Sequence, residues 1–155
     1  MITLQPTEDY RLIASLNEEV QELHASLHPQ IFKHYDEARV EAALKKMIVS
    51  VNCYAFVALQ DGTPIGYMVL LVKEYPESAF TFARETLYID QIGVLNGYQK
   101  TGVGSLMMEH AERLAKGLDI NRVELDHWTA NTVAAAYFRN RGYTLYREQL
   151  FKEIS

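Results

Sequence analysis

Apolar residues in the first fifty positions recur at two different spacings, which predicts a short strand followed by two helices. Ile2 and Leu4 alternate with polar residues, and Pro6 ends this strand. Apolar residues then recur every three or four positions, which predicts a helix capped by Thr7. The inward face of this helix is expected to hold Ile13, Leu16, Val20, Leu23 and Leu27. A second helix is expected from about Asp36 to Ser50, with Val40, Ala43, Leu44, Met47 and Ile48 inward.

A period of two then replaces the helical spacing and predicts paired strands. Cys53 to Leu59 alternates, and Asp61-Gly62 supplies the residues of a tight hairpin turn. Ile65 to Val72 is the expected returning strand, and its unbroken apolar run indicates burial on both faces. Lys73 to Arg84 is expected to be a loop or a ragged strand end. Leu87 to Val94 is the next predicted strand.

The last third of the chain combines a strongly periodic helix with weaker elements. The helix starts at Val103 and is expected to end at Gly117 in a left-handed cap. The elements expected after it are a strand at Arg122–Trp128, a helix at about Thr132–Arg141 capped by Gly142, and a final strand at Tyr143–Phe151. No repeat or linker is evident, so the sequence predicts one mixed α/β domain over residues 1–155.

Composition excludes several classes of protein. The chain has 155 residues, 48% hydrophobic and 23% charged, as in ordinary globular domains. A net charge of −5 argues against binding nucleic acid, and no apolar run is long enough for a membrane helix. The N-terminus lacks the pattern of a signal peptide, so a cytoplasmic location is expected. Cys53 is the only cysteine, and His24 and His28 are interpreted as surface histidines, so no metal site is expected.

A glycine-containing loop, Leu95 to Gly102, joins a predicted strand to the most periodic helix. Glycines in such a loop let backbone N–H groups converge on an anion, and the helix dipole adds positive potential there. The sequence has no GxxxxGK[ST] string, which excludes a P-loop. A dinucleotide fingerprint would need a third glycine where Met107 stands. The loop therefore predicts a phosphate-binding site of another kind.

Two motifs at the correct separation resemble the GNAT superfamily of acyl-CoA-dependent N-acyltransferases. The family pattern Q/R-x-x-G-x-G/A matches Gln99, Gly102 and Gly104. A second block of the family, which spans its last helix, matches Asn131, Ala134, Tyr137, Phe138, Gly142 and Tyr143. The resemblance implies a mixed, mostly antiparallel sheet with helices on both faces, and acetyl-CoA as cosubstrate.

The resemblance also implies which residues bind the cosubstrate. In the family the pyrophosphate lies on backbone amides of the glycine loop, and the pantetheine arm pairs with the end of the fourth strand. Carried onto this sequence, the loop residues are Gln99, Lys100, Thr101, Gly102, Val103, Gly104 and Ser105. The strand residues are Ile92, Gly93 and Val94, and the last helix adds Asn131 and Phe138. Lys100 is the one cation of the loop and could equally be a solvated side chain.

Direct acyl transfer to an amine needs a base, for which Asp90, His127 and Glu85 are candidates. Asp90 lies on the fourth predicted strand and His127 on an expected apolar face of the fifth. Tyr88 stands where the histone-acetylating branch of the family carries its base. Phe138 stands where the family usually has a tyrosine that protonates the leaving thiolate, so another proton source is needed.

Two functions from different classes follow. The first is an N-acetyltransferase that acts on a primary amine of a small molecule or peptide, with cationic amines favoured by the acidic net charge. The second is a non-catalytic acyl-CoA sensor, suggested by Phe138. Family members are often dimers, so a homodimer is a further expectation. The aromatic residues Tyr75, Phe80, Phe82 and Trp128 are expected either to line an acceptor pocket or to cover the sheet.

Overall fold

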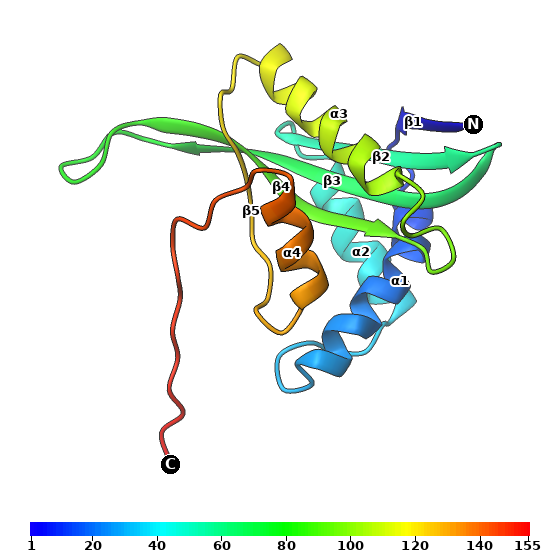
Figure 1. Cartoon of the computed structure of the whole chain (residues 1–155), viewed down its shortest axis with the longest axis horizontal. Helices are drawn as coiled ribbons and strands as arrows, with labels where there is room; N and C mark the ends of the chain where they lie inside the picture. Colours follow the sequence, from blue (N-terminus) through cyan, green and yellow to red (C-terminus); the bar gives the residue numbers. More distant parts are fainter. The chain divides into compact units, whose positions relative to one another are not determined.

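Five strands form one sheet in the order β1-β2-β3-β4-β5 (Figure 1). The first four strands are antiparallel to their neighbours, and β5 pairs parallel to β4. The computed structural model describes residues 1–155, in two units, 1–125 and 126–155. The first unit holds β1 (Ile2–Pro6), α1 (Tyr10–Leu27), α2 (Glu37–Ile48), β2 (Cys53–Gln60), β3 (Thr63–Tyr75), β4 (Arg84–Val94), α3 (Val103–Gly117) and β5 (Val123–Leu125). The second holds α4 (Thr132–Asn140).

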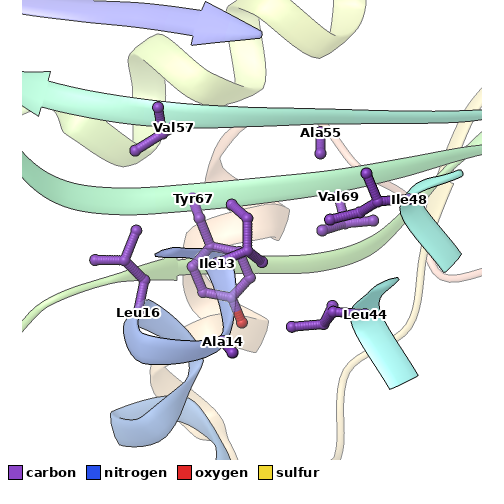
Figure 2. Close-up of a cluster of buried hydrophobic side chains, with 9 residues drawn as sticks. All are labelled: Ile13, Ala14, Leu16, Leu44, Ile48, Ala55, Val57, Tyr67 and Val69. Atoms are coloured by element: carbon purple, nitrogen blue, oxygen red, sulfur yellow. The ribbon is translucent and has the colours of Figure 1, made fainter. Parts of the chain in front are cut away.

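Helices cover both faces of the sheet, which confirms the mixed, mostly antiparallel α/β architecture predicted from the sequence. Helices α1 and α2 lie on one face and α3 on the other (Figure 1). The α1/α2 face buries a continuous apolar cluster, drawn in Figure 2, of Ile13, Ala14, Leu16, Leu44, Ile48, Ala55, Val57, Tyr67 and Val69. No helix is both long and apolar enough to span a membrane.

The caps of the first two helices are aspartates. The Asp9 carboxylate accepts a hydrogen bond from the Leu12 N–H at 3.0 Å, so the cap of α1 lies two residues after Thr7, the predicted cap. Thr7 instead accepts from the Asp9 N–H. Leu23, which was expected to face inward near the other end of α1, is 46% exposed and does not belong to the core. In α2, Ala43 was also expected to face inward but is exposed, and the buried side chains are those of Leu44 and Ile48.

Two hairpins connect β2, β3 and β4. Asp61 and Gly62 form the first turn with φ angles of 49° and 85°, the left-handed pair that suits a two-residue hairpin. The segment 73–84, expected to be a loop or a ragged strand end, is mostly loop: β3 continues to Tyr75, β4 begins at Arg84, and residues 76–83 connect them. These ends pair with each other and form an arm that projects beyond the other strands (Figure 1).

Helix α3 ends at Gly117 as predicted, but this glycine is not the left-handed cap. Gly117 is helical, and Asp119 adopts the left-handed conformation with φ 59°. The Ile120 N–H donates to the Ala115 carbonyl at 2.8 Å and the Asp119 N–H to that of Lys116. These two bonds are a Schellman cap, which the sequence did not reveal because aspartate takes the glycine position.

Two predicted strands are wrong in part or entirely. The strand expected over residues 122–128 contains only Val123–Leu125. The strand expected over residues 143–151 is absent, because that segment has no neighbouring strand to satisfy its backbone. The helix prediction in the second unit is confirmed, as is its cap, since Gly142 has a φ of 92°.

Candidate active site at the end of the fourth strand

The parallel pairing of β4 and β5 stops halfway along β4. The three paired positions run from Leu87 with Val123 to Ile89 with Leu125. Strand β4 continues for five more residues, to Val94, with β3 as its only strand neighbour. The segment from Asp90 to Val94 is therefore a sheet edge, whose backbone can pair with an extended ligand.

A β-bulge lies where the two strands part. Val69 of β3 faces Gln91, and Leu70 faces Ile89, so Asp90 is an extra residue with no partner on β3. Bulges bend a strand and redirect its side chains, and they are frequent beside active sites. The bulge places Asp90 at the first position of the open edge.

A buried polar network joins α1 to the two strands beside this bulge. The Asn17 side-chain amide donates to the Tyr67 hydroxyl at 2.9 Å and to Gln91 Oε1 at 3.3 Å. The Tyr67 hydroxyl donates to Gln91 Oε1 at 3.0 Å. Tyr67 is fully buried, and burial raises its pKa to about 12, so the hydroxyl stays protonated. None of these three residues was predicted from the sequence as a site residue, although Asn17 is a polar residue within the apolar stripe of α1.

Gly93 allows α1 and Tyr67 to approach the open edge of β4. A Cβ at this position would lie 2.7 Å from Val20 Cγ2 and 2.8 Å from Tyr67 Cε1. On the opposite face, a Cβ at Gly66 would lie 2.9 Å from the Gly93 carbonyl oxygen. Both glycines are thus required by close packing, in addition to any role in binding a ligand.

The glycine loop leads from the open edge directly into α3. Lys100 and Gly102 have φ angles of 63° and 92°, and the first bond of α3 is from the Leu106 N–H to the Gly102 carbonyl. The amides of Val103 and Gly104 therefore precede the helical ladder, and no side chain caps this end. A Cβ at Gly102 would meet nothing within 4 Å. This geometry suits an anion held by backbone N–H groups.

Two side chains hold the loop against the rest of the first unit. The Glu19 carboxylate of α1 accepts a hydrogen bond from the Asn96 N–H at 2.7 Å. The Gln99 amide donates to the Val94 carbonyl at 3.3 Å. Gln99, the first residue of the family motif, thus connects the loop to the end of β4.

Asp90 lies in an environment that disfavours its charge. Burial raises the pKa of its carboxyl group, and a hydrogen bond from Gln91 and the positive charge of Lys73 oppose this rise. The Lys73 ammonium lies 3.6 Å from the centre of the Tyr88 ring. Burial, followed by the charge of Asp90, raises the pKa of the Cys53 thiol to about 11, which is consistent with its interpretation as a packing residue.

The remaining predicted site residues belong to the second unit. His127 is exposed and follows the end of β5, so its expected place on an apolar strand face is wrong. Asn131 caps α4, where its Oδ1 accepts from the Ala134 N–H at 3.2 Å. Phe138 is buried, with ring centroids 5.3 Å from Tyr137 and 6.0 Å from Tyr143. His127 was misplaced because β5 ends at Leu125, whereas Asn131 and Phe138 lie on the predicted last helix.

The other candidates lie away from the open edge of β4. Glu85 is exposed on the arm and faces Glu74 of β3. Phe80 and Phe82, at the tip of the arm, are 95% and 86% exposed, so they do not cover the sheet as one of the two predictions had it. The structure therefore brings together Asp90, Ile92–Val94 and Gln99–Ser105 on one continuous stretch of chain.

Comparison with known proteins agrees with this geometry. A sequence profile described as the acetyltransferase (GNAT) family matches residues 17–143. No curated protein matches the chain. The crystal structure of a mutant protein from Bacillus halodurans is similar to this chain, with 20% sequence identity and a TM-score of 0.90. The match covers 100% of this chain and 99% of that one.

Two further solved structures are similar in fold. An aminoglycoside 6′-N-acetyltransferase from Acinetobacter haemolyticus is 16% identical with a TM-score of 0.72, over 99% of this chain and 98% of that one. A protein from Clostridium acetobutylicum, described as a predicted acetyltransferase and solved with acetyl-CoA, is 13% identical with a TM-score of 0.75. That match covers 99% of this chain and 96% of that one. The strand–loop–helix site and the family profile together place the chain in the acetyltransferase (GNAT) family.

Proposed function

We propose that this protein is an acetyl-CoA-dependent N-acetyltransferase that modifies a primary amine of a small molecule or peptide. The observation that carries the proposal is the continuity of three features along one stretch of chain: the bulge at Asp90, the open edge to Val94 and the amides at the start of α3. The family profile extends across the boundary between the two units, so we propose that residues 1–155 act as one domain.

The open edge and the loop fit the shape of acetyl-CoA. Its extended pantetheine arm has amide groups that can pair with the backbone of Ile92–Val94, as an added strand would. Its pyrophosphate can accept hydrogen bonds from the amides of Lys100–Ser105 at the positive end of α3. Gln99 would hold the loop in place, and Asn131 and Phe138 would contribute from α4. The bound cosubstrate supplies an activated thioester.

Asp90 is the residue that we propose as general base. An alkylamine has a pKa of about 10.4, so it arrives protonated and must lose a proton before it attacks. Burial raises the pKa of Asp90, which makes its carboxylate a better proton acceptor. The amine nitrogen then bonds to the acyl carbon, the carbon–sulfur bond breaks, and the nitrogen loses its second proton to water. Water returns a proton to the thiolate, because Phe138 has none to give. His127 remains the alternative base.

The acceptor is proposed to be a cationic amine. The net charge of −5 favours positively charged substrates, and Asp90 adds a negative charge at the start of the open edge. The fold similarity to an aminoglycoside 6′-N-acetyltransferase makes aminoglycosides a sensible first group to test. Polyamines and lysine peptides are the other groups in the panel.

Binding of acetyl-CoA tests the proposed cosubstrate site. Gly102→Asp places a carboxylate beside the phosphate position and is expected to lower affinity by at least about tenfold. Gly62→Asp is the matched control, because Gly62 also has a positive φ, of 85°, with nothing within 4 Å of its Cβ position. Calorimetric titration of both variants with acetyl-CoA separates the charge from the backbone strain. Equal affinities would contradict the assignment of the loop.

Turnover then distinguishes the enzyme from the second candidate, a non-catalytic acyl-CoA sensor, which the buried Phe138 favours. Release of CoA thiol is measured with the amine panel for the wild type, Asp90→Asn and His127→Ala. Loss of turnover with Asp90→Asn alone supports the proposed base, and loss with His127→Ala alone supports the alternative. Tight binding of acetyl-CoA without turnover on any amine would support the sensor.

A further inference from the structure

We propose that Tyr67 and Asn17 are positioning residues that orient the side-chain amide of Gln91, so that its N–H group is directed at the carboxylate of Asp90. This inference rests on the proposed function only in giving Asp90 a catalytic role. The arrangement itself depends on three hydrogen bonds among the buried groups of α1, β3 and β4.

The hydrogen bonds of the network decide which end of the Gln91 amide faces Tyr67. The Tyr67 hydroxyl has a single proton, and it accepts from the Asn17 amide, so it must donate to Gln91. The Gln91 atom that faces Tyr67 is therefore the amide oxygen. A second donor, Asn17 Nδ2, reaches the same oxygen at 3.3 Å.

The opposite end of the same amide is consequently a donor. A flip of Gln91 alone would leave the Tyr67 hydroxyl and the Asn17 amide without an acceptor in a buried site, which costs about 1–3 kcal/mol for each unsatisfied group. A joint flip of Gln91 and Asn17 would restore these bonds, but it would turn the Gln91 oxygen toward the Asp90 carboxylate, where two acceptors repel each other. Gln91 thus donates to the Asp90 carboxylate, with which it shares a hydrogen bond.

The network is rigid because its central ring is held on all sides. Tyr67 is 0% exposed and belongs to the apolar cluster of α1, α2, β2 and β3, and its ring extends from β3 toward α1 (Figure 2). Gly93, opposite Tyr67 on β4, leaves space for the ring. The core of the protein therefore fixes a hydroxyl next to the bulge, and the hydroxyl fixes Gln91.

The network adjusts the proton affinity of Asp90. Three other titratable groups couple electrostatically to this carboxyl: Lys73 and Tyr67 on β3, and Cys53 on β2. Lys73 lowers its pKa, and Tyr67 and Cys53 are neutral at pH 7 because their own pKa values are raised. Removing the orienting hydroxyl lets the Gln91 amide turn away from the carboxylate, and the weakened hydrogen bond should raise the pKa of Asp90 further.

The test is a carbon-13 NMR titration of the Asp90 carboxyl in the free protein, which needs no substrate. Tyr67→Phe removes only the hydroxyl and is expected to raise the pKa of Asp90. Tyr35→Phe is the matched control, because the Tyr35 hydroxyl bonds to the Ala14 carbonyl of α1 at 3.0 Å, outside the network. Tyr35→Phe is expected to leave the pKa of Asp90 unchanged. Gln91→Met removes the donor itself without relying on Tyr67.

The outcomes separate this inference from the proposed function. If Tyr67→Phe and Gln91→Met each raise the pKa of Asp90, and the double variant raises it no further, the two residues act through one path, as proposed. An unchanged Asp90 pKa in both single variants, with the fold intact, would overturn the inference. If the pKa rises while Asp90→Asn retains full turnover, the network stands and the catalytic role fails. If the pKa rises and Asp90→Asn also abolishes turnover, the network and the catalytic role both stand. The acidic limb of the kcat/KM profile of Tyr67→Phe then moves to higher pH, and kcat/KM on that limb falls several-fold.

Discussion

Replacing Gly93 by alanine tests how tightly the core supports the open edge of β4. The added methyl group would lie 2.7 Å from Val20 Cγ2 and 2.8 Å from Tyr67 Cε1, distances that real Cβ contacts do not show. The ring of Tyr67 is fully buried and tied to Gln91, so it cannot move aside without disturbing the network. The substitution must therefore displace α1, the ring or the strand.

The expected cost follows from two opposing effects. Overpacking a well-filled core costs about 1–3 kcal/mol, and alanine recovers roughly 0.5–1 kcal/mol through its smaller loss of backbone entropy on folding. We therefore expect Gly93→Ala to lower the free energy of unfolding by about 1–2 kcal/mol. For a chain of this length, that corresponds to a fall in Tm of about 3–6 °C.

Urea unfolding followed by circular dichroism measures this effect, with Gly117→Ala as the matched control. Gly117 is an exposed helical residue, and a Cβ there would meet nothing within 4 Å. Alanine at this position should raise stability by about 0.5–1 kcal/mol. The two substitutions are chemically identical and should have opposite signs. If Gly93→Ala were as stable as the wild type while Gly117→Ala was stabilised, the packing argument for Gly93 would be refuted.

Two further predictions concern stability and reactivity. Asp9→Ala should lower the free energy of unfolding by about 1 kcal/mol in the same urea assay, because it removes the cap of α1. Asp9→Asn retains the acceptor oxygen and should cost only a few tenths of a kcal/mol. Equal losses in the two variants would contradict the capping role. Cys53, with its pKa raised to about 11, should react with a thiol reagent at about pH 8 on the order of a hundredfold more slowly than a free cysteine. Asp90→Asn should accelerate that reaction, and a rate typical of an exposed thiol in the wild type would disprove the burial argument.

Local patterns were sufficient to predict most of the fold. The period-two stretches became β2, β3 and β4, and the Asp61-Gly62 turn formed as its residues require. Motif spacing likewise indicated the glycine loop, because a binding site made of backbone amides needs glycine at fixed positions. These features depend on residues close together in the sequence.

The errors arose where distant segments decide the structure. Tyr143 to Phe151 was expected to be a strand but has no neighbouring strand with which to pair. Tyr67 lies 50 positions after Asn17 and 24 positions before Gln91 in the sequence. Only the packing of α1 on the sheet brings the three residues together. No local pattern signals such a network, although a polar residue inside an apolar helical stripe is a reason to look for one.

The bulge has a consequence for how this site can vary between related proteins. Ile89 and Ile92 face Leu70 and Met68, so they point to the same side of the sheet although they are three residues apart. Removing residue 90 would restore a regular ladder and leave every other side chain of β4 on its present face. The register of the sheet therefore does not depend on the side chain at this position. Mutation can explore new chemistry at position 90 while selection for folding acts on its neighbours.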